Sequence, residues 1–178
     1  MSNIRKICIC AICIALCYVL PLVLHPLGLG QILSPMHIPV LVCGLCCGPI
    51  FGAICGIAGP ILSSVLTGMP PSMMLPSMIP ELLAYGIFAG ILIRAFRTKS
   101  TLCNVYLALI PTMLIGRVVG ALAKAVFYFI GVFGVNAFSL KEVASAYFVA
   151  TLPGIIVHLL FIPTLVVTLK SEKLIKLK

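Results

Sequence analysis

The sequence predicts an all-α integral membrane protein with six transmembrane helices and both ends of the chain in the cytoplasm. Of the 178 residues, 62% are hydrophobic and only 8% are charged, whereas a soluble domain is about half apolar and a quarter charged. Long apolar stretches recur from Ile7 to Leu169, and about eighteen such residues suffice to cross a hydrocarbon core. We therefore expect a single membrane domain over residues 1–178, embedded in the lipid bilayer.

The first three helices follow from apolar runs and the residues that interrupt them. We expect the first helix over about Ile7 to Leu24, and an external loop over residues 25–36 because His-Pro and two glycines follow it. The next two helices are expected over about His37 to Cys47 and Pro49 to Leu66, separated at Gly48. The second helix is too short to cross a membrane. Either it begins earlier, or this pair is tilted and packed against protein.

A proline-rich segment separates the third helix from the fourth. Residues 67–77 contain three prolines and three methionines, so we interpret them as a second external loop. The fourth helix is expected over about Pro80 to Phe96. Glu81 then lies in its first turn, where the helix dipole favours an anion.

The last two helices are predicted from the remaining apolar chain. A fifth helix begins near Leu102, and its apolar run continues to about Gly134, which is longer than a membrane requires. Tilting or a break near Pro111 would accommodate that length. Residues 136–145 are expected outside, and the sixth helix spans about Ala146 to Leu169.

Basic residues orient this bundle. Nine of the twelve Lys and Arg residues gather near the chain ends and after the fourth helix, and cytoplasmic segments carry such an excess. We therefore place these nine inside: Arg5, Lys6, Arg94, Arg97, Lys99, Lys170, Lys173, Lys176 and Lys178. The net charge of +9 thus indicates membrane orientation, and no nucleic-acid partner is expected.

Two basic residues within the fifth helix are the main candidates for substrate binding. Arg117 and Lys124 are seven residues apart, so they lie two turns apart on one helix face, which Gly120 and Tyr128 share. One interpretation is structural: the cations extend to the membrane interfaces or pair with Glu81. The other is that they hold an anion such as a carboxylate, because a bound anion offsets the cost of a buried cation.

Other polar residues are expected at the outer ends of neighbouring helices. Glu81 and Tyr85 are four residues apart on the fourth helix, and His37 opens the second. Each alone is more often structural, but together they suggest an outward-facing pocket for a small molecule. The predicted substrate-binding residues are His37, Glu81, Tyr85, Arg117, Lys124 and Tyr128.

The sequence lacks the residues that most enzymes need. It has no aspartate, no phosphate-binding loop of the G-x-x-x-x-G-K-[ST] type and no compact catalytic cluster. We therefore expect no catalytic residues, no cofactor and no ATP hydrolysis by this chain. Eight of its nine cysteines lie in apolar runs, where cysteine packs as a small hydrophobic residue, so we expect no metal site.

The sequence resembles the substrate-binding S components of energy-coupling factor (ECF) vitamin transporters. The resemblance covers nearly the whole chain and rests on the six-helix layout and on three segments: Ala11–Ala15, Pro35–Pro49 and Gly59–Pro71. It implies a prokaryotic cell-membrane protein that partners a transmembrane coupling subunit and two cytoplasmic ATPases. An A-x-x-x-A motif docks the coupling subunit in that family, and Ala11 and Ala15 match it. They alternatively pack within the bundle.

The resemblance also implies a ligand class. The chain is similar to S components for small water-soluble vitamins, including the carboxylates niacin and pantothenate, and Arg117 and Lys124 favour an anion. Two other functions stay open at this level: a self-contained secondary transporter or channel, and a small membrane-embedded enzyme. Neither has a motif in the sequence.

Overall fold

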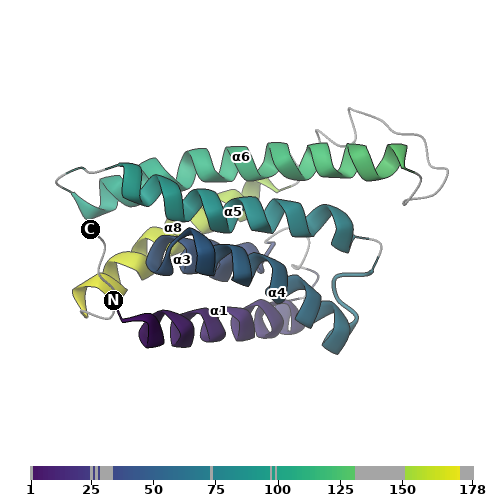
Figure 1. Ribbon diagram of the computed structural model, residues 1–178, viewed down its shortest axis with the longest axis horizontal. Helices are drawn as coiled ribbons and strands as arrows, with labels where there is room; N and C mark the ends of the chain where they lie inside the picture. The colour runs from purple at the N-terminus through teal and green to yellow at the C-terminus, as the bar shows by residue number, and fades with distance from the viewer. Residues whose placement is uncertain are drawn as a thin grey trace.

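The protein is a bundle of roughly aligned helices. The computed structural model describes residues 2–24, 26, 28, 34–72, 74–96, 98, 100–130 and 151–172. These residues form six α-helices and no strand: α1 (Asn3–Leu24), α3 (His37–Cys47), α4 (Pro49–Thr67), α5 (Leu75–Ala95), α6 (Thr101–Phe129) and α8 (Leu152–Ser171). Figure 1 shows that α1 begins and α8 ends at the same end of the bundle. We call this the cytoplasmic end, as the basic residues predict.

The expected membrane fold is confirmed. Five of the described helices are long and apolar enough to cross a membrane, and α3 is a shorter apolar helix. The predicted bounds of α3 and α4 agree with the structure to within one residue. Helix α1 begins four residues before the predicted Ile7, because no helix-breaking residue precedes that position.

Helix α5 corrects two expectations. It begins at Leu75, not near Pro80, so the end of the predicted loop is helical. Pro76 occupies the first turn, where a missing N–H costs nothing, and Pro80 removes only one hydrogen bond close to the helix start. As a result Glu81 lies beyond the first turn, and interaction with the helix dipole does not explain its position.

Helices α6 and α8 match their predictions in part. Helix α6 runs without a break through Pro111 and ends at Phe129, and its 29 residues extend about 44 Å. Because α6 does not break at Pro111, this length exceeds a hydrocarbon core of about 30 Å and requires tilting or extension beyond the core. Residues 131–150 lie outside the described part of the chain, so the expected external segment and the predicted start at Ala146 are not placed.

The short helix α3 occupies the middle of the bundle. All its residues except Ile38 are buried, and eleven residues extend only about 16 Å. The backbone carbonyl of Met36, just before α3, accepts a bond from the Cys17 thiol at 3.8 Å. Cys17 lies about 21 Å along α1 from its cytoplasmic start, so α3 begins deep within the bundle, packed against protein.

Glycines allow α3, α4 and α5 to approach closely. A Cβ atom on Gly86 of α5 would lie 2.2 Å from the backbone oxygen of Gly52 on α4. A Cβ on Gly44 of α3 would lie 2.5 Å from the oxygen of Gly86. These backbones are thus in direct contact, as small residues allow in membrane helices.

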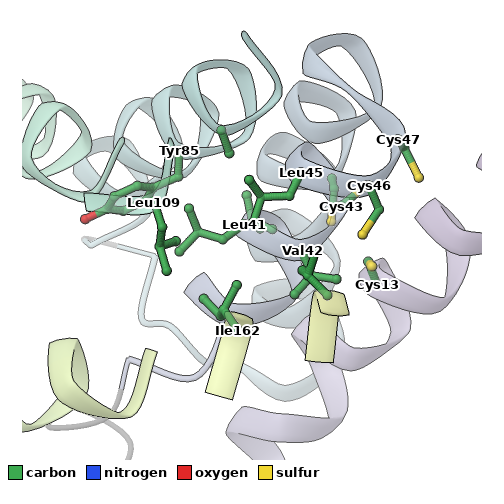
Figure 2. Close-up of a cluster of buried hydrophobic side chains, with 14 of the residues drawn as sticks. Cys13, Leu41, Val42, Cys43, Leu45, Cys46, Cys47, Tyr85, Leu109 and Ile162 are labelled. Atoms are coloured by element: carbon green, nitrogen blue, oxygen red, sulfur yellow. The ribbon is translucent and has the colours of Figure 1, made fainter. Parts of the chain in front are cut away.

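Cysteines fill much of the interface between α1, α3 and α4. Seven of the nine are buried, whereas Cys8 and Cys103 are exposed. Figure 2 shows Cys13 of α1 pointing toward the cysteines of α3, among apolar side chains such as Val42. The prediction that they pack as small hydrophobic residues is confirmed for these seven.

Candidate substrate site

Three of the predicted residues meet where α3 begins. His37 Nε2 lies 3.3 Å from Glu81 Oε1 on α5, and the Tyr85 hydroxyl donates to the same oxygen at 3.2 Å. The rings of His37 and Tyr85 pack edge to face with centroids 5.0 Å apart. All three residues are buried, with 6%, 5% and 1% of their surface exposed. The structure thus assembles a buried polar cluster inside an apolar bundle.

His37 is also fixed from the opposite side. Its ring Nδ1 and its backbone N–H both lie 3.0 Å from the carbonyl oxygen of Ser34. A carbonyl only accepts hydrogen bonds, so Nδ1 must carry a proton. The orientation of the imidazole is therefore determined by Ser34 at one nitrogen and by Glu81 at the other.

His158 of α8 is also part of this cluster. It is not among the substrate-binding residues predicted from the sequence. It is fully buried, and its ring stacks on that of His37 with centroids 5.9 Å apart. The feature of the sequence that could have indicated a role for His158 is that it is a lone histidine within an apolar helix. Sequence alone does not show which helix such a residue faces.

Arg117 of α6 is buried beside the start of α8. Only 3% of its surface is exposed, and its guanidinium donates to the hydroxyl of Thr151. Thr151 occupies the N-cap position of α8. The guanidinium therefore lies at the positive end of a helix dipole.

Two glycines of α6 give the cluster its close fit. A Cβ on Gly116 would lie 2.3 Å from the Tyr85 ring, and one on Gly120 would lie 2.8 Å from Glu81 Oε2. The Tyr85 hydroxyl also lies 3.5 Å from the Met113 carbonyl oxygen. Helix α6 thus covers the side chains of Tyr85 and Glu81.

Lys124 and Tyr128 lie farther along α6. Both are half-buried, and the Tyr128 ring packs edge to face on Phe129. Seven residues separate Lys124 from Arg117, which corresponds to about 10 Å along the helix axis. These two residues therefore lie beyond the cluster around His37, toward the outer end of α6.

The hydroxyl residues at the end of α4 have a structural role. The Ser63 hydroxyl donates to the Met69 carbonyl at 2.7 Å, and the Thr67 hydroxyl donates to the Ser63 carbonyl at 2.6 Å. Ser64 likewise donates to the carbonyl of Pro70 at 2.9 Å. These bonds satisfy backbone carbonyls in the last part of α4 and in the residues that follow it.

Ala11 and Ala15 are both exposed on α1. They lie one turn apart, and the buried cysteines of α1 face the opposite way, into the bundle.

Within the described residues, the His, Cys and Glu side chains form no group suited to hold a metal ion.

The family of the chain follows from comparison with known protein families. The model of the ECF transporter substrate-specific component matches residues 5–169. The chain belongs to this family. Comparisons with curated proteins and with solved structures gave no match. The ECF substrate-specific component is a transporter subunit and not an enzyme, and its apolar helices cross the prokaryotic cell membrane several times.

Proposed function

We propose that this S component captures a small, vitamin-like carboxylate, of which niacin and pantothenate are the leading examples, for ATP-driven uptake by partner subunits. The observation that carries the proposal is the position of Arg117, which is buried at the N-terminal end of α8. Cations are normally favoured at the opposite end of a helix. A carboxylate bound there would interact favourably with both the guanidinium and the helix dipole.

The neighbouring side chains support a polar ligand. We propose that hydrogen bonds to it come from the cluster at the start of α3 and from the outer part of α6. The proposed substrate-binding residues are His37, Glu81, Tyr85, Arg117, Lys124 and Tyr128. In this proposal Arg117 pairs with the carboxylate, and the aromatic residues contact the rest of the molecule.

Uptake in this proposal depends on a transmembrane coupling subunit and two cytoplasmic ATPases. The chain has no phosphate-binding loop of its own. The exposed pair Ala11 and Ala15 offers a flat strip for a partner helix on α1. We therefore propose that the coupling subunit docks on this face.

Calorimetry on the purified, detergent-solubilised protein tests the ligand class. Arg117→Met keeps much of the side-chain length but removes the charge, and we expect nicotinate or pantothenate to bind more weakly by about 2–5 kcal/mol. Arg5→Met is the matched control because Arg5 is exposed at the start of α1. If the Arg117 variant binds both carboxylates as tightly as the control does, its charge is structural and the proposal is wrong.

A further inference from the structure

Glu81 poses an electrostatic problem for an anion site. Its side chain is buried, with 7% of its surface exposed, and a lone carboxylate there would repel a second one strongly. Something in the protein must therefore balance its charge if the ligand is an anion. His37 is in the right position, with Nε2 3.3 Å from Glu81 Oε1.

The hydrogen bonds determine how many protons this pair holds. Nδ1 of His37 carries one proton because it faces the Ser34 carbonyl at 3.0 Å. The contact between Nε2 and Oε1 needs a second proton, which belongs either to the imidazole or to the carboxyl group. In the first case the pair is an imidazolium with a carboxylate, and in the second both groups are neutral. The net charge of the pair is zero in both cases.

The surroundings fix the carboxyl group in this contact. The Tyr85 hydroxyl donates to the same oxygen at 3.2 Å, and Gly120 of α6 lies against the other oxygen. A Cβ at position 120 would lie 2.8 Å from this oxygen, so glycine lets α6 approach Glu81 closely. The geometry therefore favours Glu81 bonding to His37 and Tyr85 over reaching toward a ligand.

We infer that His37 is a positioning residue whose role is to neutralise Glu81, so that this pair presents no net charge to an anionic ligand. His37 and Glu81 act as one neutral unit, and neither contacts the carboxylate of the ligand. The expected effect on ligand binding rests on the proposed function. The number of protons held by His37 and Glu81 is independent of that function.

A double-mutant cycle separates neutralisation from direct contact. His37→Gln preserves hydrogen bonding but removes the imidazole that shares the second proton with Glu81, so residue 37 no longer balances an ionised Glu81. We expect nicotinate to bind at least about tenfold more weakly to this variant near neutral pH. Glu81→Gln keeps the pair neutral, because the amide donates to Nε2, and should therefore weaken binding less than His37→Gln does. The double variant His37→Gln with Glu81→Gln should recover most of the affinity.

Two outcomes of the cycle would overturn the inference. If His37→Gln binds nicotinate normally, the pair does not set the charge of the site. If the double variant binds as weakly as His37→Gln alone, the weaker binding does not come from an unbalanced charge on Glu81.

Nuclear magnetic resonance of ¹⁵N-labelled histidine tests the proton count without any ligand. The chain has three histidines, and the spectrum of His37→Gln identifies the signals of His37. We expect Nδ1 of His37 to be protonated in the wild-type protein and in Glu81→Gln, with Nε2 unprotonated in the latter. A wild-type His37 with a bare Nδ1 and a protonated Nε2 would contradict the inference. If neither nicotinate nor pantothenate binds the wild-type protein, the proposed ligand class is wrong. The spectrum would then still test whether His37 and Glu81 together carry no net charge.

Discussion

Replacing Gly86 by alanine should separate α4 from α5. The added Cβ would lie 2.2 Å from the oxygen and 2.3 Å from the carbonyl carbon of Gly52, whereas nonbonded atoms prefer about 3.5 Å. Both obstacles are backbone atoms, so a side-chain rotation does not relieve the overlap. The helices must move apart by about 1 Å, and overpacking of this kind costs about 1–3 kcal/mol.

Gly59→Ala is the matched control. There the new Cβ would meet only the side chain of Cys17, at 2.9 Å from the sulfur, and this side chain has more freedom to shift. We therefore expect a clearly smaller loss of stability than for Gly86→Ala.

The buried thiols provide the assay. The chain has no tryptophan, but its seven buried cysteines become accessible to a fluorogenic maleimide on unfolding. Replacing the exposed Cys8 and Cys103 by serine lowers the background. We expect Gly86→Ala to lower Tm by several degrees, at about 2–4 °C for each kcal/mol in a chain of this size. An unchanged Tm, or a larger loss in Gly59→Ala, would refute the close packing of α4 on α5.

The remaining predictions concern transport and binding. Uptake of the ligand by cells should disappear when the coupling and ATPase subunits are deleted, and unchanged uptake would show that the chain transports by itself. Ala11→Phe or Ala15→Phe should abolish uptake and leave ligand binding to the purified protein intact, because both residues are exposed on α1 away from the His37 cluster. If ligand binding falls as much as uptake does, these alanines belong to the bundle core. Lys124→Met should weaken nicotinate binding less than Arg117→Met does, because Lys124 is half-buried. Lys141 lies outside the described residues, in the segment that the sequence predicts to be external; if so, its charge is screened and Lys141→Met should leave affinity unchanged. Calorimetry of both lysine variants tests this order, and a larger loss for Lys124→Met than for Arg117→Met would contradict it.

Hydrophobic runs and helix breakers predicted most of the fold. Gly48 and Pro49 located the junction between α3 and α4 because they act through local backbone geometry. The sequence predicts the start of α5 too late because clustered prolines indicate a loop, whereas Pro76 fits the first turn of a helix. A composition rule does not distinguish a proline that ends a helix from one that begins it.

The candidate site was predictable only in its residue types. Polar residues in an apolar chain are few, so His37, Glu81 and Arg117 could be identified from the sequence. Their partners could not, because the Ser34 carbonyl, the Thr151 hydroxyl and the His158 ring come from other segments brought together by tertiary packing. Pairing of Arg117 with Glu81 was one expectation, but the ion pair that the structure records for Glu81 is with His37.

The most direct test of the proposed function is to identify the small molecules that co-purify with the protein. Mass spectrometry measures the small molecules extracted from equal amounts of folded wild-type protein and folded Arg117→Met protein. The comparison shows how much ligand is retained when the buried cation is removed. We predict a small carboxylate in the wild-type extract that is absent or strongly reduced in the Arg117→Met extract. A neutral or cationic ligand, or a carboxylate retained equally by both proteins, would contradict the proposal that this S component binds an anion through Arg117.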